Sequence, residues 1–275
     1  MRRDKSFNMI EIAKVIATTY MGVKGTGRNR PCIFHCVDQE NKSEEYIVKF
    51  YGAIRELVIC EVSAALLGQA LGINIPDIAI VYADQRLAQF IRDGEARENF
   101  KKEPGPHFGS HNLKNGYSVM SSGYNLANES LLEALNIFAF DMLIQNMDRT
   151  ASGFTGNSNI LYKGHKLYAI DHELSFSFIN ILGGSPEPWS LRGSELVSRH
   201  IFYLPLRKYS ESNEISFSMF LEKLSAMPDE YMENVMQALP SEWYNERYAE
   251  KIITHISLIR SNIERFHRGL LEVFA

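Results

Sequence analysis

Several features that define special classes of protein are lacking in this sequence. It contains only three cysteines, Cys32, Cys36 and Cys60, and they leave no second pair to complete a four-ligand zinc site. We therefore expect reduced, structural thiols. No internal period or low-complexity block is present, which argues against a repeat architecture.

Long apolar segments and an excess of positive charge are also lacking. The longest apolar stretch, 131–144, contains two acidic residues and is shorter than the roughly 20 residues that a membrane helix needs. Glu11 and Lys14 interrupt the segment that would have to be the apolar core of a signal peptide. The net charge is -4, so no overall positive field attracts nucleic acid or an anionic membrane. We expect a soluble cytoplasmic protein with neither partner.

What is present is ordinary globular material: 275 residues, 45% of them hydrophobic and 11% aromatic. This length suits one large domain or two coupled lobes. The first third predicts a small antiparallel sheet, interrupted by one helix at 54–71 that Gly72 ends. Its expected strands are 10–20, 32–37, 46–50, 78–82 and 87–91.

The rest of the chain predicts mainly helices, after a connecting segment. Residues 92–123 are rich in Gly, Pro, Asn, Lys and Glu, so we place a connection or flap there, between an N-lobe at 1–91 and a mainly helical C-lobe at 124–275. Ser130 and Glu133 resemble a capping box before a helix. One hairpin, 159–162 with 167–170, turns at 163–165. Further helices are expected at 217–226, 229–238 and 245–267.

Lys49 and Glu61 are the first candidate pair. Strand alternation puts Ile47 and Lys49 on one face, opposite Tyr46, Val48 and Phe50. Glu61 is the only charge on a helical stripe of small and aliphatic residues, and a buried carboxylate is costly unless it is paired. Lys49 is the nearest plausible partner. The alternative is that Glu61 reaches water and Lys49 is a surface lysine.

Two further candidates lie in the second part of the chain. Asn146-Met147-Asp148-Arg149 directly follows an apolar helix, where a polar loop is also common. In the hairpin, the residue numbers of paired positions should add up to about 329, so Asn159 lies opposite Ile170 and Asp171 lies just beyond. Amide and carboxylate oxygens gathered there suit Mg²⁺, although an ordinary polar hairpin end has the same composition.

The segment between the first two strands is rich in glycine and basic residues. Backbone N–H groups of such a loop can approach phosphate oxygens, but its Gly-x-x-Gly-x-Gly spacing fits no standard phosphate-binding pattern. A flexible basic turn is the alternative. With the lysine strand, it gives the expected nucleotide-binding residues: Gly22, Lys24, Gly25, Thr26, Gly27, Ile47 and Lys49.

The order of these features is that of a protein-kinase-like phosphotransferase. The chain resembles the HipA-like kinases, relatives of the phosphatidylinositol kinases. The resemblance rests on six segments and extends from the lysine strand to about residue 176. They are Val48-Lys49-Phe50, Glu61 with 71–76, His107-Phe108-Gly109-Ser110, 146–149, 157–161 and Ile170-Asp171-His172-Glu173. It implies an α+β, bilobal protein-kinase-like fold.

The same resemblance implies roles for the candidate residues. Lys49 would hold the α and β phosphates of ATP and pair with Glu61, and Asp148, followed by Arg149, would orient and deprotonate the acceptor hydroxyl. Asp171 with Asn159 would hold Mg²⁺. Asn157 stays open as the metal ligand because the segment after Asp148 is longer than usual in this family.

The resulting hypothesis is an ATP- and Mg²⁺-dependent kinase that acts on a Ser or Thr hydroxyl, with a protein as the favoured acceptor. A lipid or small-molecule acceptor is an alternative. A pseudokinase-like nucleotide-binding or interaction scaffold is another, motivated by the irregular glycine loop and the longer segment after Asp148. Binding of RNA by the short basic loop at 24–30 is a third, which the acidic net charge disfavours.

Overall fold

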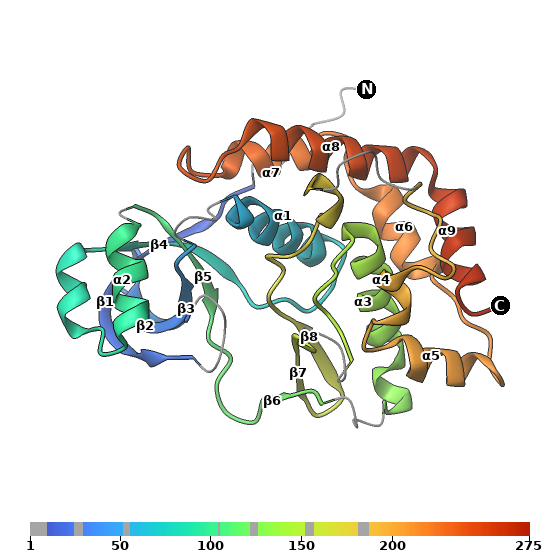
Figure 1. Cartoon of the computed structure of the whole chain (residues 1–275), viewed down its shortest axis with the longest axis horizontal. Coiled ribbons are helices and arrows are strands. Elements are labelled where there is room, and N and C mark those ends of the chain that lie inside the picture. The colour runs from blue at the N-terminus through green and yellow to red at the C-terminus, as the bar shows by residue number, and fades with distance from the viewer. Residues whose placement is uncertain are drawn as a thin grey trace. The chain divides into compact units, whose positions relative to one another are not determined.

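The computed structural model describes residues 10–24, 30–51, 56–103, 105–121, 126–151, 157–180 and 187–275. The chain divides into two compact units. The first contains residues 1–55, 78–112 and 230–244, and the second contains residues 56–77, 113–229 and 245–275. Figure 1 labels their elements.

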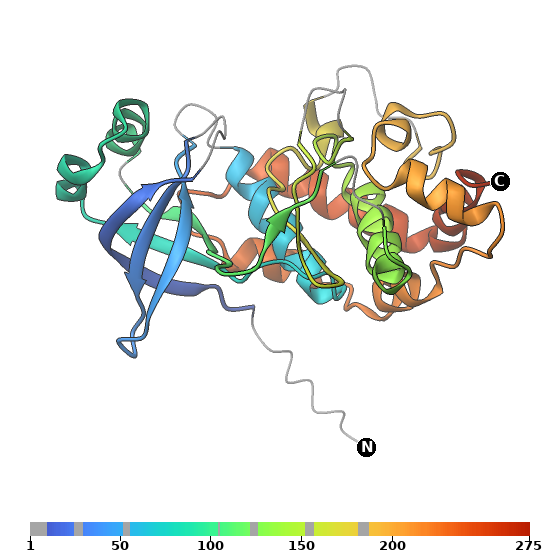
Figure 2. The same cartoon turned by 90° about the horizontal axis from the view of Figure 1, so that it is seen from below.

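The first unit is built on a closed five-stranded barrel in the order β1-β2-β3-β5-β4, whose curved strands are visible in Figure 2. The strands pair antiparallel except for β1 and β4, which run parallel. Their bounds are β1 Ala13–Val23, β2 Cys32–Val37, β3 Ser43–Lys49, β4 Ile78–Ala83 and β5 His107–His111. The expected antiparallel sheet is therefore corrected to a closed barrel with one parallel pair.

Strand β5 is the element that the sequence analysis missed, because its residues show no apolar alternation. It lies between β3 and β4 and closes the sheet. Gly109 permits this close packing, since a Cβ there would lie 2.4 Å from Val81 Cγ2. Thus the range 92–123, expected as a connection, contributes a barrel strand.

The strand predicted at 87–91 is wrong. Residues Gln85–Phe90 form a 3₁₀ helix, η2, because the Asp84 side chain accepts the Arg86 backbone N–H at 2.8 Å and starts a helical turn. With α2 (Gly94–Lys102), this segment supplies Ala88 and Phe100 to the barrel core. Segment 230–244, with α7 (Tyr231–Ala238), also belongs to this unit.

Burial in the first unit follows the predicted alternation. Val48 and Phe50 lie in the core cluster and Tyr46 packs against it. Cys32 and Cys36 are buried, free thiols in the same cluster, and burial raises the pKa of each to about 12. The expectation of reduced structural cysteines is confirmed for these two, and Cys60 of α1 is also free and buried.

The second unit is mainly helical around a buried central helix, α3 (Leu131–Ile144), of which residues 137–144 are all buried. Helix α1 (Leu57–Ala70) belongs here rather than to the barrel unit. Its Gly68 allows close contact with α3, because a Cβ there would lie 2.9 Å from Phe140 Cζ. The remaining elements are η3 Asn128–Ser130, η4 Ser177–Asn180, α4 Glu195–Ser198, α5 Tyr203–Ser210, α6 Ser218–Ala226, α8 Glu246–Ser261 and α9 Ile263–Glu272.

The hairpin of the second unit agrees with its predicted register. In strands β7 (Ile160–Lys163) and β8 (Lys166–Ala169), the residue numbers of each pair add up to 329, as expected. Strand β6 (Ser118–Val119) pairs with β7 as a third strand. Gly164, at φ +60°, occupies the turn.

The capping box is wrong, because its two side chains hold this hairpin instead. Ser130 Oγ donates to the carbonyl oxygen of His165 at 2.7 Å, and Glu133 Oε2 accepts the N–H of Leu167 at 2.5 Å. The long C-terminal helix expected at 245–267 is divided at Asn262, which leaves helical geometry at φ -125°, ψ 36°. Its buried stripe is present in both parts, with Ile252, Ile256 and Ile259 in α8 and Phe266 in α9. Within the described ranges, no helix is long and apolar enough to cross a membrane.

A buried histidine in this unit makes stability depend on pH. His255 Nε2 lies 2.8 Å from the Leu143 carbonyl oxygen, and burial lowers the pKa of His255 from 6.5 to about 4. The unfolded state therefore binds more protons below pH 6.5, and stability is lost as the pH falls from 6.5 towards 4. We expect a loss of about 2 kcal/mol from this group between pH 7 and pH 5. Urea unfolding of wild type and His255→Leu at both pH values measures it, and an equal pH effect in the two proteins would contradict the assignment.

Candidate active site

The loop that carries Asp148 starts from an abrupt helix end. Gln145 closes α3 in the left-handed conformation, at φ 47°. Asn146 then folds back, because its backbone N–H donates to the Asp141 carbonyl at 3.0 Å and its Nδ2 donates to Asp141 Oδ1 at 3.0 Å. Its Oδ1 accepts the N–H of Asp148 at 3.1 Å. The position of Asp148 is thus fixed by the last turn of α3.

The carboxylate of Asp148 is joined to Asn159, eleven positions later. Asn159 Nδ2 donates to Asp148 Oδ2 at 2.8 Å. Asn159 is buried and left-handed, at φ 48°, a conformation that is uncommon outside glycine and often found at functional sites. Asn157 is exposed, and its backbone N–H donates to the Asp148 carbonyl at 3.3 Å. Of the two asparagines, Asn159 is the one whose side chain reaches Asp148.

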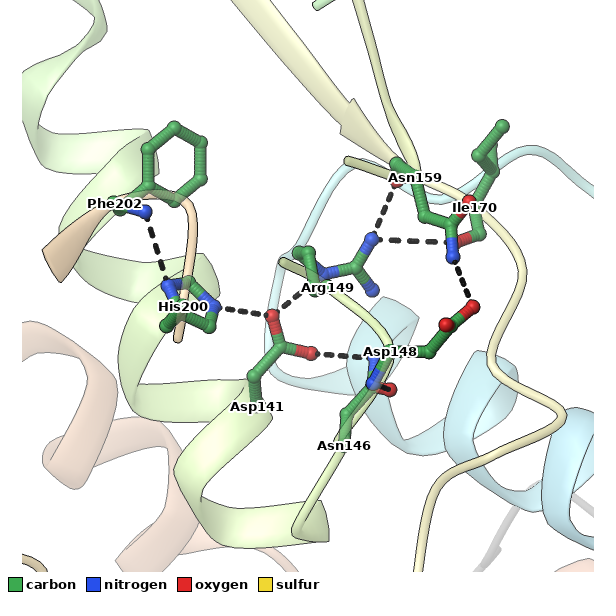
Figure 3. A network of polar contacts seen from close by, with 8 residues as sticks. All are labelled: Asp141, Asn146, Asp148, Arg149, Asn159, Ile170, His200 and Phe202. Atoms are coloured by element: carbon green, nitrogen blue, oxygen red, sulfur yellow. Dashed lines mark hydrogen bonds and ion pairs between the residues drawn. The ribbon is translucent and has the colours of Figure 1, made fainter. Parts of the chain in front are cut away.

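Arg149 is fully buried and joins three segments of the second unit (Figure 3). Its Nε donates to Asp141 Oδ2 at 2.5 Å. Its Nη1 donates to the backbone carbonyls of Asn159 and Ile170, the latter at 3.2 Å. His200 Nε2 also contacts Asp141 Oδ2, at 2.9 Å. Arg149, expected among the catalytic residues, therefore lies behind Asp148 in a buried network.

The network fixes the charge states of its members. Burial acts to raise the pKa of Asp141, but the attraction of Arg149 and the hydrogen bond with His200 outweigh it and hold this pKa at about 2. Burial lowers the pKa of His200, against the effect of Asp141. At neutral pH the network therefore contains an ionised aspartate, a cationic arginine and a neutral histidine.

Three carboxylates form a separate cluster. Oxygens of Glu61, Asp171 and Glu173 all lie within 4.8 Å of one another. Glu61 is 2% exposed, and Asp171 has a left-handed backbone at φ 59°. Carboxylate oxygens are ligands that a hard cation such as Mg²⁺ prefers, so this set fits the ion that the sequence analysis expected. Asp171 is brought next to Glu61 and Glu173, while the side chain of Asn159 is bonded to Asp148.

Lys49 lies at the end of β3 and is 8% exposed, with its Nζ 5.8 Å from the centre of the Phe108 ring. Ile47 is half-buried on the same strand. The alternative of a water-exposed Glu61 and a surface Lys49 is wrong, because both residues are buried. Lys49 belongs to the first unit and Glu61 to the second, and their pairing stays a prediction.

The glycine loop is described in part. Gly22 lies in β1, and the backbone N–H of Lys24 donates to the Pro31 carbonyl at 2.7 Å. Gly25, Thr26 and Gly27 lie outside the described residues. Phosphate binding by this loop stays a prediction.

Glu173, Asp141 and His200 were missed as site residues. Glu173 had a signal, since it is a second acidic residue two positions after Asp171. Asp141 had one too, because an acid within the apolar run 137–144 of a helix indicates a buried ion pair. His200 had none, since no local pattern connects it with residues 141–149.

The comparisons with known proteins concern the family and the fold of this chain. The family model for HipA-like kinases matches residues 21–270. No curated protein matches the chain. A solved structure of CtkA, a proinflammatory kinase of Helicobacter pylori, is similar at a TM-score of 0.50 with 11% sequence identity, over 95% of this chain and 98% of that one. The FAT and kinase domain of CtTel1 matches at a TM-score of 0.33 with 11% identity, over 100% of this chain and 24% of that one.

The similarity to CtkA indicates a kinase-like fold, and the score for CtTel1 is too low to carry an argument. The resemblance inferred from the sequence is confirmed by the family match. The two-lobe arrangement within this fold stays a prediction. The match over residues 21–270 means that this chain belongs to the family of HipA-like kinases, which are phosphotransferases.

Proposed function

We propose that this kinase transfers the γ-phosphate of ATP to a Ser or Thr hydroxyl of a protein and that it requires Mg²⁺. The observation that carries the proposal is the arrangement around Asp148. A carboxylate fixed by a helix end and bonded to Asn159 lies in the same unit as a group of three acidic side chains. Phosphoryl transfer needs such positioning and charge neutralisation rather than a covalent nucleophile.

In this proposal, Asp148 accepts the proton of the acceptor hydroxyl. The hydrogen bond from Asn159 Nδ2 to Asp148 Oδ2 holds the carboxylate in place for this role. Arg149 keeps the loop fixed from behind. Lys49 and the glycine loop hold the phosphates of ATP, a role that rests on the family.

The residues that would hold Mg²⁺ are Asp171 and Asn159, with Glu61 and Glu173 close to Asp171. The ion would neutralise the charge of the transferred phosphate. The amide nitrogen of Asn159 donates to Asp148, so its Oδ1 is the atom available to a cation. The choice of a protein as the acceptor rests only on the resemblance to the HipA-like kinases.

Thermal unfolding in the presence of ATP tests the proposal. A ligand that binds only the folded protein, at about 100 times its dissociation constant, adds about 2.7 kcal/mol to stability. We expect ATP with Mg²⁺ to raise the melting temperature of the wild type. In Asp171→Asn, which removes a carboxylate from the acidic cluster, the magnesium-dependent part of the shift should be lost. The absence of any shift at millimolar ATP in the wild type would contradict nucleotide binding and favour the scaffold.

The two asparagines supply a matched pair of variants for the same assay. Asn159→Ala removes the buried amide that contacts Asp148, whereas Asn157→Ala alters an exposed side chain. The magnesium-dependent shift should fall in the first variant and persist in the second. The opposite result would assign the metal to Asn157.

A further inference from the structure

A segment about fifty residues beyond Asp148 lies along the catalytic loop. The backbone N–H of Ile201 donates to the Arg149 carbonyl at 3.1 Å, and that of Ala151 donates to the Arg199 carbonyl at 3.0 Å. Thr150 and His200 form an antiparallel bridge between these bonds. The loop after Asp148 is thus held by backbone pairing to residues 199–201.

The side chain of His200 continues this contact into the core. It is 1% exposed, and its ring meets the Phe138 ring edge to face, with centroids 5.0 Å apart. Its Nδ1 accepts the backbone N–H of Phe202 at 3.1 Å. That N–H lies at the start of α5, where backbone donors have no partner within the helix.

This bond determines which ring nitrogen carries the proton. A nitrogen that accepts a hydrogen bond cannot be protonated, so in the neutral ring the hydrogen is on Nε2. Nε2 is the atom that faces Asp141 Oδ2, at 2.9 Å (Figure 3). The start of α5 therefore makes His200 a donor to Asp141.

Asp141 connects His200 to the active site. The same Oδ2 atom accepts from Arg149 Nε, and Arg149 Nη1 holds the carbonyls of Asn159 and Ile170. Asn159 is one of the candidate metal ligands, and Ile170 directly precedes another, Asp171.

We propose that His200 is a positioning residue of this kinase, which acts through Asp141 and Arg149 to hold the loop of Asp148 in register with the hairpin end at Asn159 and Ile170. Its ring contacts Asp141 and the backbone N–H of Phe202. The inference rests on the proposed function for its kinetic consequence, but the arrangement itself is testable without activity.

Two variants of His200 distinguish the effect of losing its hydrogen bond to Asp141 from the effect of changing the size of the side chain. His200→Leu removes the donor to Asp141, and His200→Gln can keep an N–H donor on a side chain of similar reach. His255→Leu is the matched control, because it removes another buried histidine of the second unit that bonds to a backbone carbonyl outside this network.

The first measurement is NMR of protein labelled with ¹⁵N in histidine and arginine. We expect His200 to carry its proton on Nε2 in the wild type. The Nε–H of Arg149 should exchange with solvent at least about tenfold faster in His200→Leu than in the wild type, His200→Gln or His255→Leu. A proton on Nδ1, or equal exchange in all four proteins, would overturn the proposal whether or not the protein transfers phosphate.

The second measurement is the steady-state kinetics of the same proteins. Misplacement of a catalytic loop costs roughly 10- to 100-fold in kcat, so we expect that loss in His200→Leu with KM for ATP within about twofold. His200→Gln should retain most of the rate. An equal loss in His255→Leu, or no loss in His200→Leu, would overturn the positioning role. If the wild type itself is inactive with every acceptor, the proposed function fails, and Arg149 exchange alone decides the inference.

Discussion

Replacement of Asp148 by asparagine is expected to lower the rate of phosphoryl transfer by about 10²- to 10⁴-fold, the range found when a general base is removed. The asparagine lacks the negative charge that accepts the hydroxyl proton. Its Oδ1 can still accept the hydrogen bond from Asn159 Nδ2, so the loop should keep its position. The rate is measured with labelled ATP and a Ser/Thr-containing acceptor protein.

Nucleotide binding provides the control for this variant. Because Asp148 acts on the acceptor, Asp148→Asn should show the same rise in melting temperature with ATP and Mg²⁺ as the wild type. Asp171→Asn should lose both transfer and the magnesium-dependent shift. Unchanged turnover in Asp148→Asn would remove this residue from the mechanism, and loss of nucleotide binding would indicate a role with ATP.

The local parts of the fold were predictable because short-range rules fix them. The turn at Gly164 and strand alternation determine the register of the hairpin, which places Asn159 opposite Ile170 as expected. The same alternation placed Val48 in the core. Closure of the barrel could not be predicted in this way, since it depends on β5, a short polar strand that becomes a strand only between two others.

The candidate site shows the same division between local and distant information. Burial of Glu61 could be expected from its place on an apolar stripe of α1, which is a local pattern, although residues 58–65 of this helix are in fact all buried. Its position beside Glu173 depends on how α1 packs against residues more than one hundred positions later. The bond from His200 to Asp141 also depends on tertiary structure. The order of the motifs along the chain indicated the family. The contacts that hold those motifs in place join residues far apart in the sequence, so the motifs alone did not predict them.

The largest loss of stability is expected for Asp141→Asn. Both carboxylate oxygens of Asp141 accept hydrogen bonds, Oδ1 from Asn146 and Oδ2 from Arg149 and His200. An amide must therefore turn its NH₂ group towards a donor in either orientation, and Arg149 remains buried without a counter-charge. Removal of one partner of a buried ion pair typically costs about 3–5 kcal/mol. In a chain of this size that lowers the melting temperature by roughly 6–20 °C.

A double-mutant cycle distinguishes the ion pair from a general disturbance of the core. Arg149→Met also breaks the pair and removes the donor to the carbonyls of Asn159 and Ile170, but Asp141 then keeps His200 and Asn146 as donors. We therefore expect a loss that does not exceed the loss in Asp141→Asn. The double variant has neither a buried cation nor a buried anion at this place. Its loss of stability should be smaller than the sum of the two single losses, by an amount that measures the coupling. Additive losses in urea unfolding would mean that Asp141 and Arg149 stabilise the second unit independently, and that the network does not act as one structure.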